Sequence, residues 1–593
     1  MVSTIPAGTM PSATESWAEQ RPGWDRRIVS LFAVVAFLVA VFGWMAFAMV
    51  TAAREQSPSS DEPVYVGAAV VQVERHSLAY NFEHPPLAKL IVGLVLADND
   101  IHAPANPDGN QWVLGRSVIY GQGYGAERVL FLARLPIIVL AMLFGLVVFH
   151  FGRDLGGFWG GVVALTLYAF TPDVLAHGSL VGLDLPVAGF LLTTVWLLWR
   201  ARLRPYVYLP LAGVALGAAI ATKMNALAAV PLVVIWWAGW LVERRRGRWW
   251  TAILGGMAGA IGVVAVAVGV VWLCYYAVDP ALRWNPIFVK GLSDPLVAML
   301  PFPRPFLDGM NYQLSLESRD FSGFLLGEWY SGHRWYYLPA ALLIKEPLGL
   351  LGLGLAAVFS RRGWVVLVPA VVLLGAAMTG TRDWGVRYAI VVPILFAVAA
   401  AGLFRRKPPE APTRKEKPTT ARPARNEAPT NAEPAELDTP AGKEALVQAR
   451  RGALVKVRAV LISVIVLSVV VSTVRAFPYY LPYSNEAFGG PAKTYLRLTD
   501  SNVDWGQDLG RLGERLRRDY PGEPVWLVYR GSGDPGYYGI TARDPMKVPP
   551  GEVRGLLVVP ARFLPDAKPE LRALIDTSTP VGDVGHSILI YRR

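Results

Sequence analysis

Residues 28–62 read IVSLFAVVAFLVAVFGWMAFAMVTAAREQSPSSDE. The run 28–52 contains no charged residue, and it is longer than the roughly 20 residues that a helix needs to cross a bilayer. Charges begin only at Arg54, and Asp61 and Glu62 follow. This stretch predicts a transmembrane helix whose end emerges into water beside a group of ionisable side chains. A permeation pathway would instead require ionisable groups within the spans.

The composition of the chain is typical of a membrane protein. Of its 593 residues, 53% are hydrophobic and 17% are charged, and long apolar runs at this density predict several membrane helices. The net charge of +12 does not indicate nucleic-acid binding, because many of the Lys and Arg residues lie in short runs between apolar segments. The single cysteine, Cys274, permits no disulfide within the chain. An outer domain must therefore be stabilised by its apolar core.

About eleven apolar runs approach the length of a membrane span. They lie near 28–52, 128–151, 156–172, 184–200, 207–222, 224–242, 250–277, 336–359, 363–380, 386–404 and 454–476. One basic run, Arg26-Arg27, precedes the first span, and others follow every second later span, among them Arg200, Arg244–Arg246, Arg361-Arg362 and Arg405–Lys407. The positive-inside rule assigns such loops to the cytoplasm. The sequence therefore predicts a multi-pass cell-membrane protein with a cytoplasmic N-terminus and an extracytoplasmic C-terminal domain.

These spans divide the chain into regions. We predict a cytoplasmic N-terminal tail (1–27), a transmembrane domain (28–404), a disordered cytoplasmic linker (405–452), a last transmembrane helix (453–476) and a small extracytoplasmic α/β domain (477–593). Two outer loops, about 53–127 and 278–335, belong to the transmembrane domain. The linker consists mainly of Pro, Ala, Lys and Glu with almost no large apolar residue, so it cannot bury a core.

Local patterns predict elements outside the membrane. In the first outer loop we expect helices around 61–75 and 86–97, and Ser59 and Glu62 have the spacing of a capping box. In the C-terminal domain we expect helices near 504–519 and 566–576 and strands at Val525–Tyr529, Leu556–Val559 and Ile588–Tyr591.

Asp61 and Glu62 have two interpretations. Acidic residues in the first turn of a helix interact favourably with the helix dipole, and spacing alone favours this structural role. The other interpretation is a catalytic carboxylate, since a base held near the bilayer surface can take a proton from an acceptor hydroxyl.

Other ionisable residues gather at the same predicted membrane face. In the segment Glu83–Lys89, the two prolines suit the first turn of a surface helix, and His84 and Lys89 are candidates for contact with an anionic headgroup. Further candidates at the outer ends of spans are Arg128, Arg134, Asp173, His177, Asp184, Lys223, Lys345, Glu346, Arg382, Asp383 and Arg387. Each alone suits an interfacial anchor, whereas together they predict a cationic pocket suited to phosphate.

Motifs for several other activities are missing from the sequence. It contains no GxxxxGK[ST], HExxH, CxxC or GxSxG pattern. Nucleotide-driven transport, zinc proteolysis and serine hydrolysis therefore have no motif support.

An ordered series of short motifs resembles the GT-C glycosyltransferases. The motifs are DEPVY (61–65), EHPPLAK (83–89), ARLP (133–136), HGSLVGLDLP (177–186), ATKMNAL (221–227), IKEPL (344–348) and GVRYAIVVP (385–393). The set is most similar to the protein O-mannosyltransferase-like family, which includes dolichyl-phosphate-mannose–protein mannosyltransferases and aminoarabinose transferases. Bacterial members often carry a stretch similar to Asp500–Leu509. The resemblance implies a GT-C fold over about 28–404, which would then be the catalytic domain.

The resemblance also implies roles for individual residues. Asp61 matches the catalytic acid of the first loop, and Asp184 matches the acidic position of the second outer loop. Basic positions near the lipid phosphate are matched by Arg134, Lys223, Lys345 and Arg387. No metal-ligand cluster is evident in the sequence, although Asp61 and Asp184 are candidates to share a divalent ion.

The expected function is an inverting transfer of a sugar from a polyprenyl-phosphate-linked donor to an acceptor hydroxyl at the outer membrane face. The acceptor is a protein, a lipid or a glycan, and the chain lacks the long central outer insertion of eukaryotic protein mannosyltransferases. One alternative is a multi-pass transporter or flippase of lipid-linked sugars, which requires essential polar residues deep in the spans. The other is a non-catalytic cell-envelope assembly protein, for which the carboxylates of the first loop would be dispensable.

Overall fold

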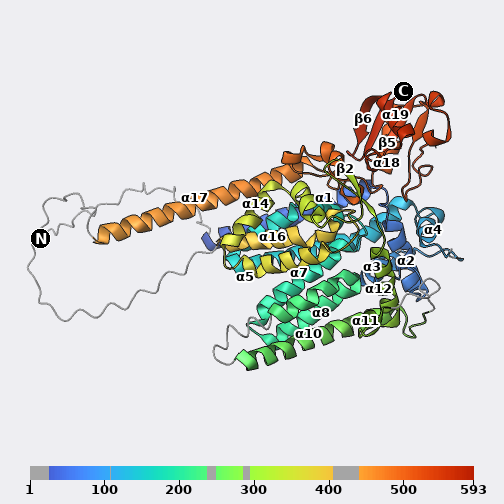
Figure 1. Cartoon of the computed structure of the whole chain (residues 1–593). Helices are drawn as coiled ribbons and strands as arrows, with labels where there is room; N and C mark the ends of the chain where they lie inside the picture. The colour runs from blue at the N-terminus through green and yellow to red at the C-terminus, as the bar shows by residue number, and fades with distance from the viewer. Residues whose placement is uncertain (1–25, 107–108, 237–248, 285–293, 405–439) are drawn as a thin grey trace, which may run out of the picture.

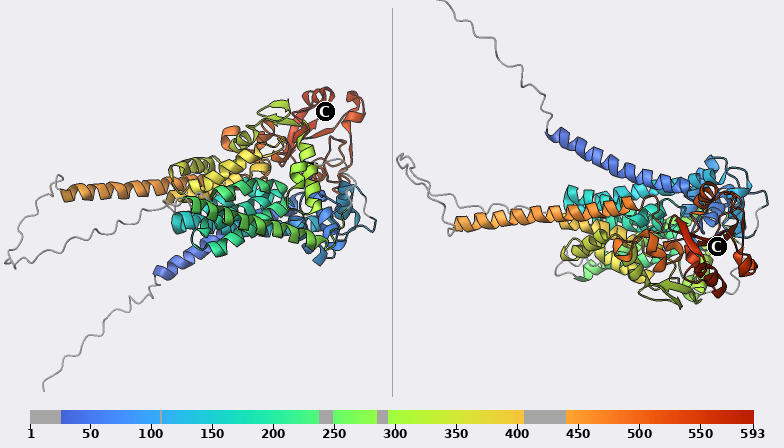
Figure 2. Two further views of the ribbon diagram at one scale, coloured as in Figure 1. Left: turned by 60° about the horizontal axis from the view of Figure 1, so that its bottom comes forward. Right: turned by 90° about the horizontal axis from the view of Figure 1, so that it is seen from above.

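The fold is a bundle of helices that carries its longer loops and a small sheet domain at one end. The computed structural model describes residues 26–106, 109–236, 249–284, 294–404 and 440–593. The helices of the first outer loop and the C-terminal domain lie at the same end of the bundle, whereas α1 (Arg26–Glu55) and α17 (Pro440–Arg475) extend from its other end (Figures 1 and 2). The helical membrane class with a small C-terminal sheet domain is thus confirmed.

The helix labelled α5 (Ala126–Ala169) is a hairpin of two antiparallel arms. Gly157 interrupts it with φ +73°, a left-handed backbone conformation that favours glycine. The hydroxyl of Tyr168 donates to the carbonyl of Ala141 at 2.8 Å, so residues far apart in the helix lie side by side. The two arms correspond to the predicted spans 128–151 and 156–172.

Further helices correspond to most of the other predicted spans. They are α7 (Asp184–Ala201), α8 (Pro205–Thr222), η2 (Met224–Ala229), α10 (Trp249–Val278), α13 (Tyr337–Lys345), α14 (Leu348–Ala356), η3 (Ala357–Phe359), α15 (Trp364–Ala377), η4 (Val386–Ala389), α16 (Val391–Ala401) and η5 (Gly402–Phe404). By length and apolar composition, five helices among the described residues can cross a membrane, or six if α13 and α14 form one bent span. Three further apolar helices are shorter. The count of about eleven spans therefore stays a prediction.

The predicted span 336–359 is broken rather than straight. The chain changes direction by 117° between helices α13 and α14. Glu346 ends the first of them with ψ +144°, because a residue that precedes a proline is disfavoured in the helical region. Pro347 is that proline.

The outer loops fold onto the end of the bundle. The first contains α2 (Glu62–Glu74), α3 (Leu87–Asp98), α4 (Gln111–Arg116) and the short π-helix η1 (Ser117–Gly121), which confirms the two predicted helices. The backbone N–H of Ser59 donates to Glu62 Oε2 at 2.8 Å, which is one half of the predicted capping box. The second loop contains α11 (Pro295–Ala298), α12 (Arg304–Glu317) and an antiparallel hairpin of β1 (Ser322–Leu325) and β2 (Glu328–Ser331).

The C-terminal domain contains a five-stranded mixed sheet in the order β4-β3-β5-β7-β6. Its strands are β3 (Val525–Leu527), β4 (Ala542–Arg543), β5 (Leu556–Pro560), β6 (Thr579–Val584) and β7 (Ile588–Arg592), and its main helices are α18 (Leu509–Asp519) and α19 (Pro569–Asp576). The predicted strands correspond to β3, β5 and β7. Strands β4 and β6 were not predicted, because one is only two residues long and the other is mostly exposed. Short 3-10 turns precede or connect these elements, namely η6 (Glu486–Phe488), η7 (Pro491–Leu496), η8 (Asp500–Asn502), η9 (Pro545–Lys547), η10 (Pro550–Glu552) and η11 (Ala561–Phe563).

Part of the predicted disordered linker is helical, whereas the apolar segment Gly452–Arg475 agrees with the predicted last span. Residues 440–452 were assigned to the linker, whereas α17 already begins at Pro440. This part of the chain is rich in Ala, Leu, Lys, Arg and Glu, which are good helix formers. The rest of the predicted linker, like the tail 1–25, lies outside the described residues.

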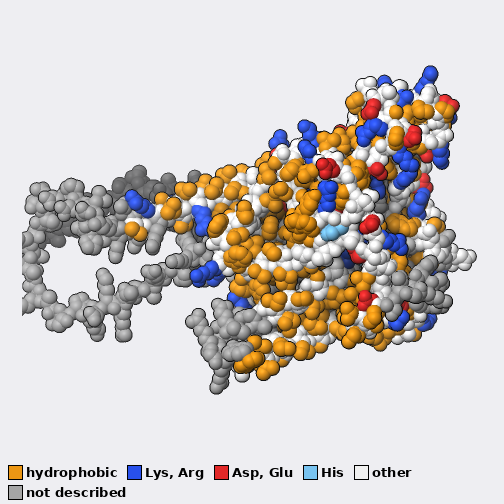
Figure 3. Space-filling view, viewed as in Figure 1, with side chains coloured by type: hydrophobic (Ala, Val, Ile, Leu, Met, Phe, Trp, Pro, Cys, Tyr) orange, Lys and Arg blue, Asp and Glu red, His pale blue; other side chains and the backbone are white. Residues whose placement is uncertain are grey.

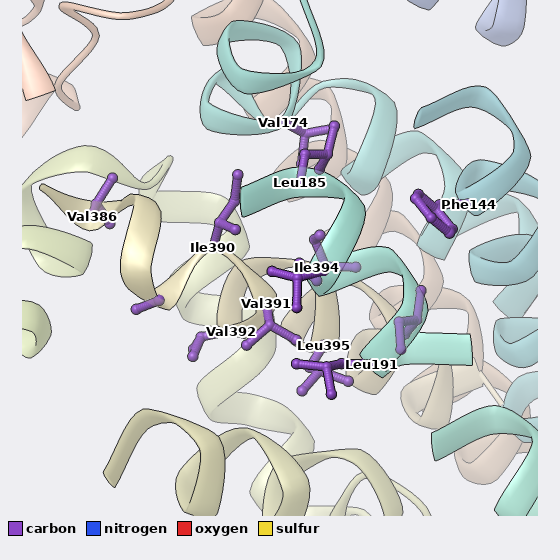
Figure 4. Packing of buried hydrophobic residues seen from close by; sticks show 14 of the residues in the cluster. Phe144, Val174, Leu185, Leu191, Val386, Ile390, Val391, Val392, Ile394 and Leu395 are labelled. Atoms are coloured by element: carbon purple, nitrogen blue, oxygen red, sulfur yellow. The ribbon is translucent and has the colours of Figure 1, made fainter. Parts of the chain in front are cut away.

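Apolar packing fixes the start of α7 and the turn η4. Side chains from α5, α6 (Pro172–Gly178), α7 and the segment 386–395 pack together in one buried cluster, among them Phe144, Val174, Leu185, Val386 and Ile390 (Figure 4). Leu185 follows Asp184, and Val386 precedes Arg387. The core thereby holds the backbone of two ionisable candidates. In the space-filling view, apolar side chains cover the bundle and most charges gather at the loop end (Figure 3).

Candidate active site

A cavity of about 780 Å³ opens among the elements at the loop end of the bundle. Its lining comes from both outer loops, from the ends of several helices and from the C-terminal domain. Ionisable residues of the lining include Asp61, Glu83, His84, Lys223, Glu317, His333, Arg334, Arg382, Asp383, Arg387, Asp500 and Arg562. Another part is apolar and includes Met224, Leu227, Ala228, Met310, Leu314, Leu338, Ala376 and Met378. The cavity therefore offers both charge and apolar surface to a ligand.

Four of the predicted residues form one chain of charges, of which Asp61, Lys223 and Arg387 line this cavity and Asp184 does not. Arg387 Nη1 lies 2.9 Å from Asp61 Oδ2 and 4.0 Å from Asp184 Oδ2. Lys223 Nζ lies 2.6 Å from Asp184 Oδ1. Two carboxylates and two cations thus alternate in the order Asp61, Arg387, Asp184, Lys223.

Each member of this chain stands at the end of a helical element. Asp61 is the N-cap residue of α2, and Asp184 is the first residue of α7. Lys223 is extended between α8 and η2, and Arg387 lies in η4. Helix ends meet at one level of the bundle, which brings residues from four separate parts of the sequence together.

Aromatic rings limit the movement of the two cations. The guanidinium carbon of Arg387 lies 4.2 Å from the ring centre of Trp505 and 5.1 Å from that of Tyr388. Lys223 Nζ lies 5.0 Å from the Tyr388 ring. Such cation–π contacts stabilise a cation in a defined position. Arg387 Nε is buried and has no hydrogen-bond partner among the described residues.

His84 lines the cavity, and Lys89 supports it from behind. Lys89 Nζ donates to the backbone carbonyls of Asn81 and His84 at 2.6 and 2.7 Å and to Asn81 Oδ1 at 3.1 Å. Lys89 is buried and does not line the cavity. Burial holds the pKa of His84 well below its ordinary value, and the charges of Lys223, Lys89 and Arg382 lower it further. His84 therefore faces the cavity as a neutral imidazole near neutral pH.

Glu62 and Arg134 form a buried ion pair away from the cavity. Arg134 Nε and Nη2 donate to the two carboxylate oxygens of Glu62 at 2.7 and 2.6 Å. The remaining donors of Arg134 contact the carbonyls of Ala53, Gln56 and Ser57. Neither residue lines the cavity. The pair holds the segment that connects α1 to Asp61.

Lys345 is also buried behind the cavity. Its Nζ donates to the carbonyls of Leu481 and Asn502 at 2.5 and 3.1 Å and lies 3.3 Å from Asp173 Oδ1. It does not line the cavity. The structure therefore separates Lys345 and Arg134 from Lys223 and Arg387, although the sequence grouped all four as phosphate ligands.

A second polar group on the cavity wall was only partly anticipated. Asp383 accepts from the Tyr330 hydroxyl at 2.7 Å and from the Arg334 backbone N–H at 2.9 Å, and Arg382 pairs with Glu317. The hairpin β1-β2 and helix α12 supply these partners. Asp383 and Arg382 belong to the candidates predicted at the outer ends of spans, whereas no sequence motif indicated Tyr330 or Glu317.

The C-terminal domain contributes residues that were not predicted to belong to the site. Asp500, Trp505 and Arg562 line the cavity. For Asp500 and Trp505, the sequence contains one indication, which is that the stretch Asp500–Leu509 resembles bacterial family members. Arg562 lies in a short 3-10 turn after β5, and no pattern pointed to it.

The residues present do not fit a divalent ion shared by Asp61 and Asp184. The guanidinium of Arg387 contacts both carboxylates, and its positive charge opposes a metal cation at the same place. Among the described residues there is also no group of three or more His, Cys, Asp or Glu side chains that could hold a metal ion.

Comparisons with known proteins point to one group of enzymes. Residues 126–272 match the family model described as dolichyl-phosphate-mannose-protein mannosyltransferase. This match contains Arg134, Asp184 and Lys223. No curated protein matches the sequence.

Three solved structures are similar to the chain at low sequence identity. ArnT from Cupriavidus metallidurans in the apo state has 13% identity and a TM-score of 0.45, with 95% of this chain and 98% of that chain covered. The same protein bound to undecaprenyl phosphate has 13% identity and a TM-score of 0.43, with the same coverage. The S. cerevisiae protein O-mannosyltransferase Pmt1-Pmt2 complex bound to the sugar donor has 17% identity and a TM-score of 0.30, with 42% of this chain and 34% of that chain covered.

Proposed function

We propose that this membrane glycosyltransferase moves a sugar from a polyprenyl-phosphate donor to an acceptor hydroxyl. The family match over residues 126–272 confirms its resemblance to the mannosyltransferases. The reaction takes place at the outer membrane face with inversion at the anomeric carbon. The observation that carries this proposal is the alternating chain Asp61, Arg387, Asp184, Lys223 at a cavity that is partly apolar.

The cavity suits a donor that combines a phosphate with a lipid. Lys223 and Arg387 can bind phosphate oxygens through charge-assisted hydrogen bonds, which are stronger than neutral ones. The apolar residues of η2 and α15 that line the cavity, such as Leu227 and Ala376, suit the first part of a polyprenyl chain.

The proposed chemistry is one direct displacement. Asp61 takes the proton of the acceptor hydroxyl as a general base. The acceptor oxygen forms a bond to the anomeric carbon while the bond from that carbon to the phosphate oxygen breaks. The phosphate leaves with the electron pair, and Arg387 and Lys223 stabilise its charge. Such preorganised charges contribute strongly to the rate of a reaction in a site shielded from water.

Asp184 has a supporting role in this proposal. Its carboxylate contacts both Lys223 and Arg387 and keeps the two cations on the same side of the cavity. Glu62, Arg134, Lys89 and Lys345 are proposed to stabilise the backbone around the site, since each is buried and none lines the cavity.

The outer location of the site is a proposal based on charge distribution. A second group of basic residues occurs at the predicted cytoplasmic loops, where Arg200 pairs with Asp154 and Arg362 donates to the carbonyl of Leu155. Positive charges at helix ends are typical of the cytoplasmic face. Asp61 follows α1 at its opposite end from Arg26. A site outside the cell has no access to cytosolic nucleotide sugars, so an activated sugar must arrive on a lipid carrier.

The test is a transfer assay with the purified chain in lipid nanodiscs. Polyprenyl-phosphate sugars are supplied with protein, lipid and glycan acceptors, and mass spectrometry detects the product. The anomeric configuration of the product is then compared with that of the donor. Inverted product supports the proposal. Retained configuration, or movement of the lipid-linked sugar across the bilayer without transfer, contradicts it.

The acceptor class is determined by a second measurement in cells. Mass spectrometry of envelope glycans, lipids and glycoproteins with and without the protein identifies the molecule that loses its sugar. An unchanged envelope glycan profile together with an altered envelope structure would favour the non-catalytic assembly role.

A further inference from the structure

We infer that the segment Asp500–Leu509 of the C-terminal domain completes the active site, and that Trp505 within it positions Arg387. This inference rests on the proposed function. It concerns a segment far outside the residues that match the family model, which are 126–272. Trp505 is proposed as a positioning residue, because it acts on the reaction through Arg387.

The segment is bound to the backbone that carries Arg387. The hydroxyl of Ser501 donates to the carbonyl of Trp384 at 2.6 Å. Asn502 Oδ1 accepts from the backbone N–H of Val386 at 2.9 Å. Both contacts lie within three residues of Arg387, so a displacement of the segment would displace the turn η4.

The same segment is bound to the backbone that carries Asp61. The backbone N–H of Ser60 donates to the carbonyl of Trp505 at 2.7 Å. Ser57 adds two contacts, since its backbone N–H donates to the carbonyl of Gln507 at 3.0 Å and its hydroxyl accepts from the N–H of Leu509 at 2.9 Å. One short segment thus connects two regions that lie more than 300 positions apart in the sequence.

The segment is rigid enough to act as such a connection. Asn502, Trp505 and Gln507 are almost completely buried. Gln507 Oε1 accepts from the backbone N–H of Trp505 at 2.7 Å, and its Nε2 donates to the carbonyl of Val503 at 3.1 Å. Asn502 Nδ2 also donates to the hydroxyl of Tyr337 at 3.0 Å. These side-chain contacts fix the backbone on both sides of Trp505.

The ring of Trp505 lies between two residues of the bundle. The guanidinium carbon of Arg387 is 4.2 Å from the ring centre, and the ring of His177 meets it edge-on at 6.1 Å. Because the ring is 3% exposed, it has little freedom to rotate. It therefore limits the guanidinium to the position in which Nη1 contacts Asp61.

The test compares two buried tryptophans of the C-terminal region in the full chain. Trp505→Leu removes the ring from Arg387. Trp526→Leu is the matched control, because Trp526 is 4% exposed, belongs to β3 and donates to the carbonyl of Arg554. Both variants are expected to lower the thermal midpoint. Transfer by the folded fraction is expected to change only in Trp505→Leu.

The expected effect is a change in kcat. A misplacement of a catalytic group by about 1 Å can lower the rate by about 10²-fold, and Trp505→Leu is expected to approach this loss. The KM for the polyprenyl-phosphate sugar should change little, since Arg387 keeps its charge within the cavity. Trp505→Phe restores an aromatic face and is expected to restore most of kcat.

A double-mutant cycle separates positioning from general stability. If Trp505 acts through Arg387, the effects of Trp505→Leu and Arg387→Lys on kcat are not additive. Additive effects, or a folded Trp505→Leu variant with the kcat of the unaltered chain, would overturn the inference. Equal losses of kcat in the Trp505→Leu and Trp526→Leu variants would overturn it as well.

A milder variant keeps the test valid if Trp505→Leu does not fold. Ser501→Ala removes the hydrogen bond to Trp384 and nearly preserves the side-chain volume. It is expected to lower kcat several-fold, and an unchanged kcat would overturn the inference. The proposed function is judged separately, from the unaltered chain. An unaltered chain that transfers no sugar overturns the proposed function, and with it this inference.

Discussion

Arg387 Nη1 lies 2.9 Å from Asp61 Oδ2, although 326 positions separate the two residues in the sequence. Asp61 begins a helix of the first outer loop, and Arg387 lies in a turn that precedes α16. The side chain of Asp61 is 28% exposed and that of Arg387 is 8% exposed. The carboxylate can therefore be reached from the cavity, while the cation is held from behind. This asymmetry agrees with a base that meets an acceptor and a cation that meets a phosphate.

Asp61→Asn should abolish most of the transfer activity. The substitution keeps the size of the side chain but removes its basicity, and a general base typically contributes about 10²–10⁴-fold to the rate. The variant should insert in the membrane and still bind the lipid donor. Single-turnover transfer by purified protein measures the loss. A turnover close to that of the unaltered chain would exclude Asp61 as the base and make Asp184 the next candidate.

Glu62→Gln should mainly affect stability. The carboxylate of Glu62 pairs with Arg134 in a buried site, and the loss of one partner of a buried pair typically costs about 3–5 kcal/mol. A thermal unfolding scan in detergent should show a lower midpoint. Transfer by the folded protein should decrease far less than in Asp61→Asn. A stable Glu62→Gln variant without transfer activity would show that Glu62 takes part in the chemistry.

Lys223→Gln should weaken binding of the donor. Neutralisation of Lys223 removes a charge-assisted hydrogen bond, and the loss of such a bond typically costs about 1.5–3 kcal/mol of binding free energy. Binding of polyprenyl phosphate to the purified protein measures this loss, which should be the same for every acceptor.

Lys345→Gln provides the matched control for Lys223→Gln. Its ammonium group contacts backbone carbonyls and Asp173 behind the cavity, so the variant should lower stability and leave donor affinity of the folded fraction unchanged. The assignment fails if Lys345→Gln weakens donor binding as strongly as Lys223→Gln.

His84 should make the protein less stable in mild acid. Burial and the charges of Lys223, Lys89 and Arg382 lower the pKa of His84 well below the value of about 6.5 found in an unfolded chain. As the pH falls below this value, the unfolded state takes up a proton and the folded state does not, so stability decreases. Its contribution is fully present above the unfolded pKa and decreases towards the folded pKa. Unfolding scans at several pH values should show a smaller acid-side decrease for His84→Gln, and parallel curves for both proteins would contradict this prediction.

The orientation in the membrane can be tested with reporter fusions. The positive-inside rule predicts a cytoplasmic signal after Arg362 and an extracytoplasmic signal near Asn110 and Arg593. Signals of the opposite kind at these three positions would place the cavity on the cytoplasmic side. In that case cytosolic nucleotide sugars could reach the cavity, and its location would no longer require a lipid-linked donor.

The sequence alone determined the membrane class and several local elements. Apolar runs predict helices because a bilayer core leaves backbone groups no partner except those of the same helix. The capping-box spacing at Ser59 and Glu62 predicted a helix in this region, although the N-cap of α2 is Asp61 and not Ser59, and short apolar runs predicted three strands of the C-terminal sheet. The ordered motifs selected Asp61, Asp184, Lys223 and Arg387 as candidates.

Tertiary structure alone decided which candidates share a site. Asp61 and Glu62 are neighbours of the same charge, yet one faces the cavity and the other pairs with Arg134. The sequence cannot distinguish them, because successive helical residues point in different directions and their partners come from distant elements. The same reason applies to Lys223 and Lys345. Both end a helix, but only the packing of α7 beside α8 brings Asp184 to Lys223, and only the C-terminal segment surrounds Lys345 with carbonyl groups.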